Sequence, residues 1–505
     1  MPTRSLLASA SLIPLILCLV SAGMYSSFSA IAAEQVDSTP PPSMVELAER
    51  ISRVERGLLL PVLIEGEQDP PMVLAERMQL YQIPGVSLAV INNGKIEWVR
   101  GYGVREKGSH ISVTPTTLFQ AASISKPVAA MAALVLVQQG KLELDENVNN
   151  KLVSWKVPEN EYTKEQKVSL RGILSHTAGL TIHGFPGYDV NEQIPTLLQI
   201  LDGIEPANTK PIRIDMNPNR QWRYSGGGYT AMQQLLIDVA GKPFPNILEE
   251  VVLNPIGMEH STYQQPLIQE RAASAASAHR NGRKLKGKWY TYPEMAAAGL
   301  WTTPSDLALF AIELQNAIAG KSDKLLSTSM ANLMVTPVLQ DYGLGWGLTG
   351  KSESARFSHG GINEGFEAYM VAYKGTGKGA VVMTNGTSGL HLAHEIIRGI
   401  AREYGWIDFL GEKKVLAQVT PKLYDTYIGS YELAPNLILT VSKKGDRLFA
   451  QVTGHGQYEI FPESEVTFFP REFEAQITFV KDERDRVTHI ILRDQHGKRV
   501  AKKIK

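Results

Sequence analysis

The stretch Phe119-Gln-Ala-Ala-Ser-Ile-Ser-Lys-Pro-Val128 is the part of the sequence from which both fold and chemistry can be inferred. Within it, Ser123 and Lys126 stand three residues apart, just before an apolar run from Val128 to Val137. If this run is a helix, positions i and i+3 lie on one face, so the hydroxyl and the amine can touch. A lysine that burial keeps neutral can take the proton of a serine hydroxyl, which is otherwise a poor nucleophile. The spacing predicts a nucleophile beside its base, although an ordinary core helix can carry the same pattern.

The composition is that of a globular protein without a charge bias. The 505 residues suffice for two or three domains, and 43% of them are apolar. Lysine plus arginine equals aspartate plus glutamate at 51 each. This balance gives no reason to expect nucleic acid or an anionic membrane as a partner.

The first 33 residues have the pattern of a secretory signal. Arg4 precedes an apolar core from Leu12 to Val20, and the small residues Ala30, Ala32 and Ala33 mark a cleavage site. An uncleaved anchor is the alternative. We expect a secreted protein, with a bacterial periplasm as its location. The single cysteine, Cys18, lies in this segment, so the mature chain would depend on its core for stability.

Downstream of a short spacer at 34–45, helical and strand patterns alternate in an informative order. We expect helices at 44–60, 72–81, 128–139, 230–240, 307–314 and 391–404, and strands at 85–91, 95–103, 367–373 and 379–385. Strands at both ends of this region should share one sheet that is flanked by helices. The loop-rich segment 181–222 is of the kind that walls a site.

From about residue 415 the pattern changes to short alternating runs separated by charged turns. The runs are 437–441, 447–452, 458–461, 475–480 and 488–493. This spacing predicts a small all-β barrel or sandwich. We therefore divide the chain into a signal peptide (1–33), a spacer and helix (34–71), a central domain (72–410) and a β-domain (415–505).

Two further triplets could complete an acyl-transfer site, which needs a second proton carrier and donors for an oxyanion. In Tyr224-Ser-Gly226, a phenol beside a lysine can ionise more easily and move protons. In His359-Gly-Gly361, a polar side chain on an edge strand is followed by glycines that let the backbone approach a substrate. Taken singly, Tyr224 also fits a packed aromatic residue, and His359 fits a strand end.

Together, Ser123-x-x-Lys126, Tyr224-Ser-Gly226 and His359-Gly-Gly361 resemble the class C β-lactamase family, which includes related penicillin-binding proteins, esterases and D-amino-acid peptidases. The resemblance covers roughly residues 72–405. It extends to four more segments: 83–90, 174–180, 298–306 and 342–346. It implies an α+β fold, in which an antiparallel sheet is flanked by helices and joined by a helical subdomain. The C-terminal part resembles the lipocalin-like barrels appended to some members.

The resemblance also implies catalytic roles. Ser123 matches the family nucleophile and Lys126 its partner base. Tyr224 matches the residue that relays protons to the leaving group or the deacylating water. His176, in a segment of the same family type, is interpreted as structural.

On the substrate side, His359 stands where the family has Lys or His on the edge strand, next to Gly361. The backbone N–H groups of Ser123 and Ile362 would form the oxyanion hole. One position departs from the pattern, since the second triplet often ends in an asparagine that binds the substrate amide and here ends in Gly226. A histidine is also a weaker carboxylate anchor than a lysine, so both departures favour an esterase or a peptidase over an efficient β-lactamase.

We therefore expect a secreted serine hydrolase that forms an acyl-enzyme on an ester or amide, either a small molecule or a peptide. A β-lactamase or DD-peptidase is the alternative within the family, and a catalytically silent penicillin- or peptide-binding protein is the alternative of another class. No cofactor and no metal are expected, because His391-Leu-Ala-His394-Glu395 lacks the zinc-protease order. Self-association through the C-terminal domain is a further expectation.

Overall fold

The computed structural model describes residues 43–454, 456–494 and 497–505. The expected signal segment 1–33, with Cys18, and spacer residues 34–42 lie outside the described residues. The chain divides into two compact units, Met1–Leu47 and Ala48–Lys505. In the described part of the chain, no helix is both long and apolar enough to cross a membrane.

A six-stranded antiparallel sheet organises the second unit, with the strand order β3-β2-β11-β10-β9-β8. Its strands are β2 (Gly85–Asn92), β3 (Lys95–Gly103), β8 (Gly347–Thr349), β9 (Arg356–Asn363), β10 (Phe366–Tyr373) and β11 (Gly379–Thr384). The pair β2–β11 joins distant parts of the chain, since these strands run antiparallel with Ile91 opposite Gly379 and Val86 opposite Thr384. The prediction that strands from both ends share one sheet is confirmed.

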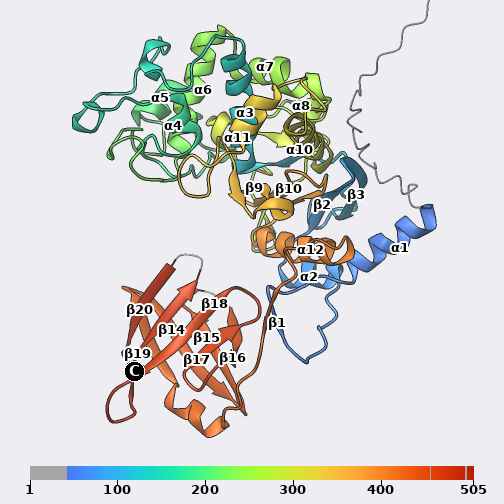
Figure 1. Cartoon of the computed structure of the whole chain (residues 1–505), viewed down its shortest axis with the longest axis vertical. Coiled ribbons are helices and arrows are strands. Elements are labelled where there is room, and N and C mark those ends of the chain that lie inside the picture. The colour runs from blue at the N-terminus through green and yellow to red at the C-terminus, as the bar shows by residue number, and fades with distance from the viewer. Residues whose placement is uncertain (1–42, 455, 495–496) are drawn as a thin grey trace, which may run out of the picture. The chain divides into compact units, whose positions relative to one another are not determined.

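Helices cover the sheet, as its buried sequence pattern requires (Figure 1). Every residue of β11 is buried. Helix α12 (Gly389–Glu403) packs on β10 and β11, and α10 (Pro304–Ile318) packs on β2 and β11. Helix α10 begins as its sequence predicts, with Thr303 accepting a hydrogen bond from the Asp306 N–H and proline at the first position.

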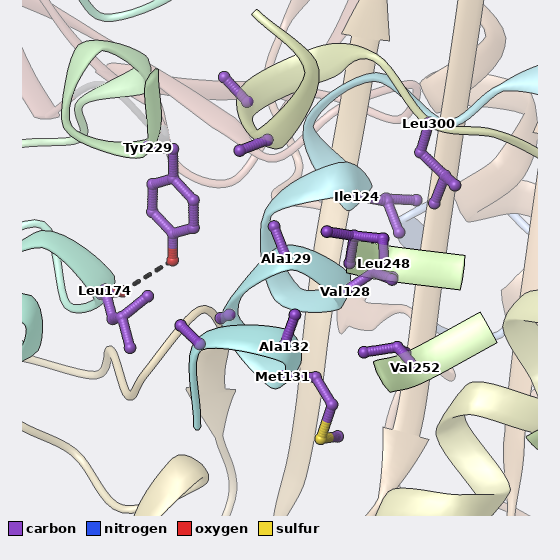
Figure 2. Packing of buried hydrophobic residues seen from close by; sticks show 14 of the residues in the cluster. Ile124, Val128, Ala129, Met131, Ala132, Leu174, Tyr229, Leu248, Val252 and Leu300 are labelled. Carbon is purple, nitrogen blue, oxygen red and sulfur yellow. Dashed lines mark hydrogen bonds between the residues drawn. The ribbon is translucent and has the colours of Figure 1, made fainter. Parts of the chain in front are cut away.

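Helix α3 (Ser125–Gln138) runs through the hydrophobic core, and its residues from Ser125 to Leu136 are all buried. Figure 2 shows Val128 and Met131 of α3 near Leu248 and Val252. A helix buried on every side has no polar face, which explains its continuous apolar sequence. Ser123 precedes the helix, in the 3-10 turn Ala122–Ile124.

The remaining helices and short strands surround this core. The helices are α2 (Leu74–Leu80), α4 (Leu170–Leu174), α5 (Leu197–Asp202), α6 (Gly226–Ala240), α7 (Phe244–Leu248), α8 (Gln269–Ala272), α9 (Met295–Ala298) and α11 (Thr328–Met334). The short strands are β1 (Val62–Ile64), β4 (Phe119–Gln120), β5 (His279–Arg280), β6 (Arg283–Lys284), β7 (Trp301–Thr302) and β12 (Glu412–Lys414).

The C-terminal strands form a closed eight-stranded barrel (Figure 1). They are β13 (Gly429–Ala434), β14 (Leu437–Lys444), β15 (Arg447–Val452), β16 (Gln457–Pro462), β17 (Thr467–Pro470), β18 (Ala475–Lys481), β19 (Val487–Asp494) and β20 (Gly497–Lys503). Its core combines aliphatic with aromatic residues, and the rings of Tyr427 and Phe479 are stacked 4.2 Å apart between centroids. The prediction of an all-β barrel is confirmed.

The predicted helix at 44–60 is too long. Helix α1 (Met44–Glu55) ends at Glu55, and the chain then becomes extended. Residues 58–64 are all buried, which a helix with one exposed face cannot achieve. The continuous apolar run that begins at Leu58 therefore indicates a buried extended segment and not a longer helix.

Candidate active site

The loop that carries Ser123 is held tightly from both sides. Strand β4 leads into it, and the Ala121 N–H donates to the Leu300 carbonyl at 2.9 Å. The Ser125 hydroxyl donates to the Ala122 carbonyl at 2.5 Å and accepts from the Leu300 N–H at 2.9 Å. Ala122 has a φ of 50°, a left-handed conformation that costs a residue other than glycine about 1 kcal/mol or more. The surrounding bonds stabilise this strained turn directly before the candidate nucleophile.

The Lys126 amine lies beside the Ser123 hydroxyl. Its Nζ is 3.0 Å from the Ser123 Oγ and donates to the Ala297 carbonyl at 2.8 Å. The side chain is only 2% exposed, and burial lowers the pKa of the Lys126 amine from 10.5 to about 7. A substantial fraction of this amine is therefore neutral at neutral pH and can accept the proton of Ser123.

Tyr224 completes a triad with this pair. Its ring centroid lies 4.9 Å from the Lys126 Nζ, and the residue precedes α6, whose N-cap is Ser225. Burial raises the pKa of the Tyr224 hydroxyl above its ordinary value of 10, and the neighbouring Ser123 hydroxyl offsets only part of this effect. The prediction that the lysine eases ionisation of the phenol is thus wrong, because desolvation of the phenolate outweighs it. Tyr224 can still donate and accept protons as a neutral phenol.

His176 accepts hydrogen bonds from both residues that flank Tyr224, a role that the sequence did not predict. Its carbonyl accepts the Arg223 N–H at 2.9 Å, and its Nδ1 accepts the Ser225 N–H at 3.1 Å. The imidazole and Tyr224 rings lie 4.2 Å apart between centroids. Burial lowers the pKa of His176 well below 6.5, so the ring is neutral and Nδ1 keeps its lone pair. The interpretation of His176 as structural fits these contacts, which act on a candidate catalytic residue.

His359 lies on β9 at the point where that strand opens toward the site. Strand β8 pairs only with Arg356 to Ser358, so from His359 onward no described strand pairs with β9 on this side. The His359 Nδ1 donates to the Gly360 carbonyl at 2.6 Å, and its Nε2 lies 3.2 Å from the Tyr342 hydroxyl. Burial and the nearby Lys126 lower the pKa of His359 to about 3. The neutral ring offers no positive charge to a substrate.

Two glycines in the predicted motifs are explained by close contacts. A Cβ on Gly361 would lie 2.2 Å from the Ala121 carbonyl oxygen, so β9 can pass the nucleophile loop only with glycine there. A Cβ on Gly226 would lie 3.0 Å from both the His183 carbonyl and the Phe185 ring. The aromatic wall therefore takes the space that a larger residue would need at Gly226.

The candidate catalytic residues Ser123, Lys126 and Tyr224 line one cavity of about 800 Å³. Its walls are Ser123, Lys126, His183, Gly184, Phe185, Trp222, Tyr224, Ala297, Ala298, Tyr342, Gly347, Ser358, His359, Gly360, Ile362, Asn363 and Leu390. The structure brings together Ser123, Lys126, Tyr224, His359 and Ile362, with Gly361 behind them. Trp222, Tyr342 and Asn363 were missed, although Tyr342 opens one of the family-like segments. Among these described wall residues none is acidic, and no cluster of metal-ligating side chains occurs in the described part of the chain.

Comparison with known proteins gives two family matches. The family model described as Beta-lactamase matches residues 73–403, and a domain of unknown function (DUF3471) matches residues 413–502. Penicillin-binding protein 4* of Bacillus subtilis is 25% identical over 82% of this chain and 94% of that protein. Protein flp of Staphylococcus aureus is 23% identical over 64% of this chain, which spans 63% of flp.

Solved structures share the fold at low identity. The octameric penicillin-binding protein homologue from Pyrococcus abyssi aligns with a TM-score of 0.56 and 19% identity, covering 85% of this chain and 98% of that one. The beta-lactamase/D-alanine carboxypeptidase from Yersinia pestis, complexed with citrate, aligns with a TM-score of 0.50 and 19% identity, covering 66% of this chain and 97% of that one. At such identities the likeness concerns the fold alone.

Proposed function

Because the chain belongs to the beta-lactamase family, we propose that it is a serine hydrolase that cleaves an ester or amide through an acyl-enzyme on Ser123, with the class C-like arrangement of Ser123, Lys126 and Tyr224. The observation that carries the proposal is the 3.0 Å contact between the Ser123 Oγ and a buried Lys126 amine whose pKa is lowered to about 7. A neutral amine at this distance is what a serine hydroxyl needs to become a nucleophile.

In the acylation step, the Ser123 Oγ bonds to the substrate carbonyl carbon while its proton passes to the neutral Lys126 amine. The negative oxygen that develops would accept the backbone N–H groups of Ser123 and Ile362, at the rim where Gly361 allows close approach. The bond to the leaving group then breaks. Tyr224, as a neutral phenol, donates its proton to the leaving group and takes one from the Lys126 ammonium.

Deacylation runs through the same groups. Water enters the cavity and loses a proton to Lys126 as its oxygen bonds to the acyl carbon. The bond to the Ser123 Oγ breaks, and the proton returns to the serine. The acid leaves and the site is restored, so this chain's own residues account for every proton.

The walls of the cavity favour simple esters or amino-acyl compounds over β-lactams. A neutral His359 cannot pair with the carboxylate that β-lactam antibiotics carry, and Gly226 offers no side-chain amide to a substrate. Aromatic residues around Phe185 supply apolar surface in place of these polar contacts.

The test is covalent labelling combined with turnover. The protein is incubated with p-nitrophenyl esters, D-amino-acid amides and nitrocefin, and intact mass and release rates are recorded. We expect ester turnover above nitrocefin turnover, and a mass increase on Ser123 that Ser123→Ala abolishes. If wild type and Ser123→Ala are indistinguishable and no adduct forms, the protein is instead a silent binding protein. Nitrocefin turnover well above ester turnover would reverse the substrate preference.

We also propose export and self-association. The signal-like segment 1–33 supports secretion to a periplasm, which cell fractionation and N-terminal sequencing of the mature protein would test. A solved structure of this fold is described as octameric, which supports self-association of this chain, and we propose the C-terminal barrel as the contact surface. Light scattering on the full mature chain would contradict this proposal if it gave the mass of a single copy.

A further inference from the structure

A second cavity, of about 330 Å³, lies between helices α1 and α12. Its described walls are Ser52, Arg53, Arg56, Gly57, Gly399, Arg402 and Glu403, and none of them lines the catalytic cavity. Helix α12 reaches both places, because Leu390, near its start, is a wall of the catalytic cavity. At 1.5 Å per residue, Gly399 lies about 13 Å further along this helix. The second cavity is therefore a separate feature that the proposed catalytic steps do not use.

Two glycines allow the chain after α1 to approach α12 closely. The Arg402 Nη2 donates to the Gly57 carbonyl at 2.7 Å, and a Cβ on Gly57 would overlap this nitrogen. A Cβ on Gly399 would lie 3.0 Å from the Gly57 carbonyl oxygen. Side chains at these two positions would push the segments apart. The glycines thus hold the Arg402 guanidinium against the backbone, at the edge of the cavity.

Helix α1 supplies the donors on the opposite wall. The Arg56 N–H donates to the Ser52 carbonyl at 3.1 Å, so the helical turn continues as far as Arg56. Ser52 and Arg53 precede Arg56 by four and three residues, and such positions share one face of a helix. One hydroxyl and two guanidinium groups of α1 therefore line the cavity together with Arg402 of α12.

Glu403 is the one acidic residue among the described walls, and its charge is already neutralised. It accepts the Arg53 Nη2 at 2.7 Å and the Arg53 Nε at 3.0 Å, which is the two-point pairing typical of arginine and carboxylate. The Arg50 Nε lies 3.6 Å from the same carboxylate, and Arg50 also pairs with Glu97 at 2.7 Å. Glu403 therefore does not neutralise the other cations of the cavity.

The two remaining arginines leave positive charge in excess. The Arg402 Nη1 lies 3.7 Å from the Asp69 Oδ2, beyond the range of a strong hydrogen bond. Among the residues that the structure describes, no carboxylate pairs with the exposed Arg56 guanidinium. The negative ends of α1 and α12 favour arginine in these last turns. That preference explains why arginines occur here, but it does not explain their convergence on a cavity with one cation left over.

The arrangement of the donors indicates the chemistry of a ligand. Guanidinium groups bind carboxylates and phosphates through paired N–H groups. A planar carboxylate is satisfied by one guanidinium, as Glu403 is by Arg53. Here donors come from two helices on opposite sides of the cavity, which suits the tetrahedral oxygens of a phosphate.

We propose that this cavity binds a phosphate group, either inorganic phosphate or the terminal phosphate of a small molecule, through Arg56, Arg402 and Ser52. The bound anion would neutralise the excess charge and fasten α1 to α12. This site goes beyond the proposed hydrolase function and does not depend on it.

The experiment is isothermal titration of the mature protein with sodium phosphate at pH 7.5, with sodium chloride holding the ionic strength constant. We expect saturable binding of one phosphate per chain. Arg56→Gln should raise the Kd about 10-fold or more, because it removes a charged donor. Arg484→Gln is the matched control, since it removes an exposed arginine from the barrel turn between β18 and β19, and it should leave the Kd unchanged.

Parallel titrations with glycerol 3-phosphate and succinate identify the form of the ligand. Glycerol 3-phosphate that binds at least as tightly as phosphate would indicate a phosphorylated small molecule, and much weaker binding would indicate the free ion. Tighter binding of succinate than of either phosphate would overturn the assignment.

Two other results would also overturn it. One is the absence of saturable binding at constant ionic strength. The other is a Kd that Arg56→Gln does not change, since phosphate would then bind elsewhere, for example beside Lys126. If Arg56→Gln does not fold by circular dichroism, Arg56→Lys keeps the charge, loses the paired N–H groups and should still raise the Kd. Hydrolysis of p-nitrophenyl esters should be equal in wild type and Arg56→Gln, so failure of the phosphate site would leave the proposed function intact.

Discussion

The pKa of Lys126 predicts a particular dependence of catalysis on pH. With a pKa of about 7, half of the Lys126 amine is neutral at pH 7. With the ordinary value of 10.5, only about one molecule in 3,000 would be neutral. Burial therefore raises the concentration of the free base more than about 1,000-fold at neutral pH. We expect log kcat/KM to rise with a slope of one below pH 7 and to level off above it.

The assay is the pre-steady-state release of p-nitrophenol from an activated ester between pH 5 and 10. The other buried groups of the site do not mimic this inflection, because the pKa of His359 is about 3 and that of His176 lies well below 6.5. His183, on the cavity wall, also has a lowered pKa, so His183→Asn serves as the control that should keep the inflection. In Lys126→Arg the cation cannot act as a base, and acylation should fall about 1,000-fold.

Two results would refute this reasoning. A profile that is flat from pH 5.5 to 8.5 would show that no base titrating near 7 takes part in acylation. A rate that keeps rising to pH 10 would show that Lys126 retains its ordinary pKa in spite of its burial.

Three further predictions concern neighbouring groups. His176→Asn tolerates the positive φ of this position and keeps an acceptor for the Ser225 N–H, so it should retain a higher kcat than His176→Leu. If His176 acts by positioning Tyr224, the two variants should have equal kcat in a Tyr224→Phe background. Unequal kcat values in that background would contradict this role. Glu294 is fully buried with both carboxylate oxygens unpaired, and burial raises its pKa from 4.5 to about 8. The folded state thus favours the protonated acid, so about 5 kcal/mol of stability present below pH 4.5 is lost as the pH rises to 8. In thermal melts, the melting temperature of Glu294→Gln should therefore rise relative to that of wild type between pH 4.5 and pH 8, and the difference should stay constant above pH 8. Gly226→Asn should lower esterase activity because of its contact with Phe185, and Phe185→Ala should relieve that loss; equal loss in both backgrounds would contradict the steric explanation.

Much of the fold follows from patterns that physical chemistry makes explicit. The Asn93-Gly94 turn joined two β-rich runs, and the order of strands and helices placed both ends of the region in one sheet. In the barrel, five of the eight strands stand out by alternation. Strand β20 does not, because Gly497–Lys503 is mostly basic, and β17 does not, because Thr467–Pro470 is short and ends in proline.

The candidate site could be predicted only in part. Ser123, Lys126, Tyr224 and His359 came from motifs and from their resemblance to a family, and the structure brings them to one cavity. The place of Asn363 in the cavity wall could not be predicted, because the groups that hold it, the Gln120 side chain and the Ala298 carbonyl, are far away in the sequence.

The protonation of Tyr224 depends on burial rather than on its neighbours in sequence. Its nearness to Lys126 suggested easier ionisation, whereas the surrounding aromatic residues exclude water and disfavour the phenolate. Local sequence motifs identify the reacting groups, whereas burial in the tertiary structure determines their protonation states.

The pairing of β2 with β11 also determines when this site can come into being. A ribosome releases the chain in order, and Ser123 emerges long before residues 379–384. Until that late strand arrives, β2 has no partner on its inner side, and the strands β8, β9 and β10, of which β9 passes the nucleophile loop at Gly361, cannot be joined to β2 in one sheet. Such distant pairing folds slowly. A nascent chain would therefore be a latent hydrolase, with its nucleophile made early and its activity withheld until synthesis of the sheet is complete.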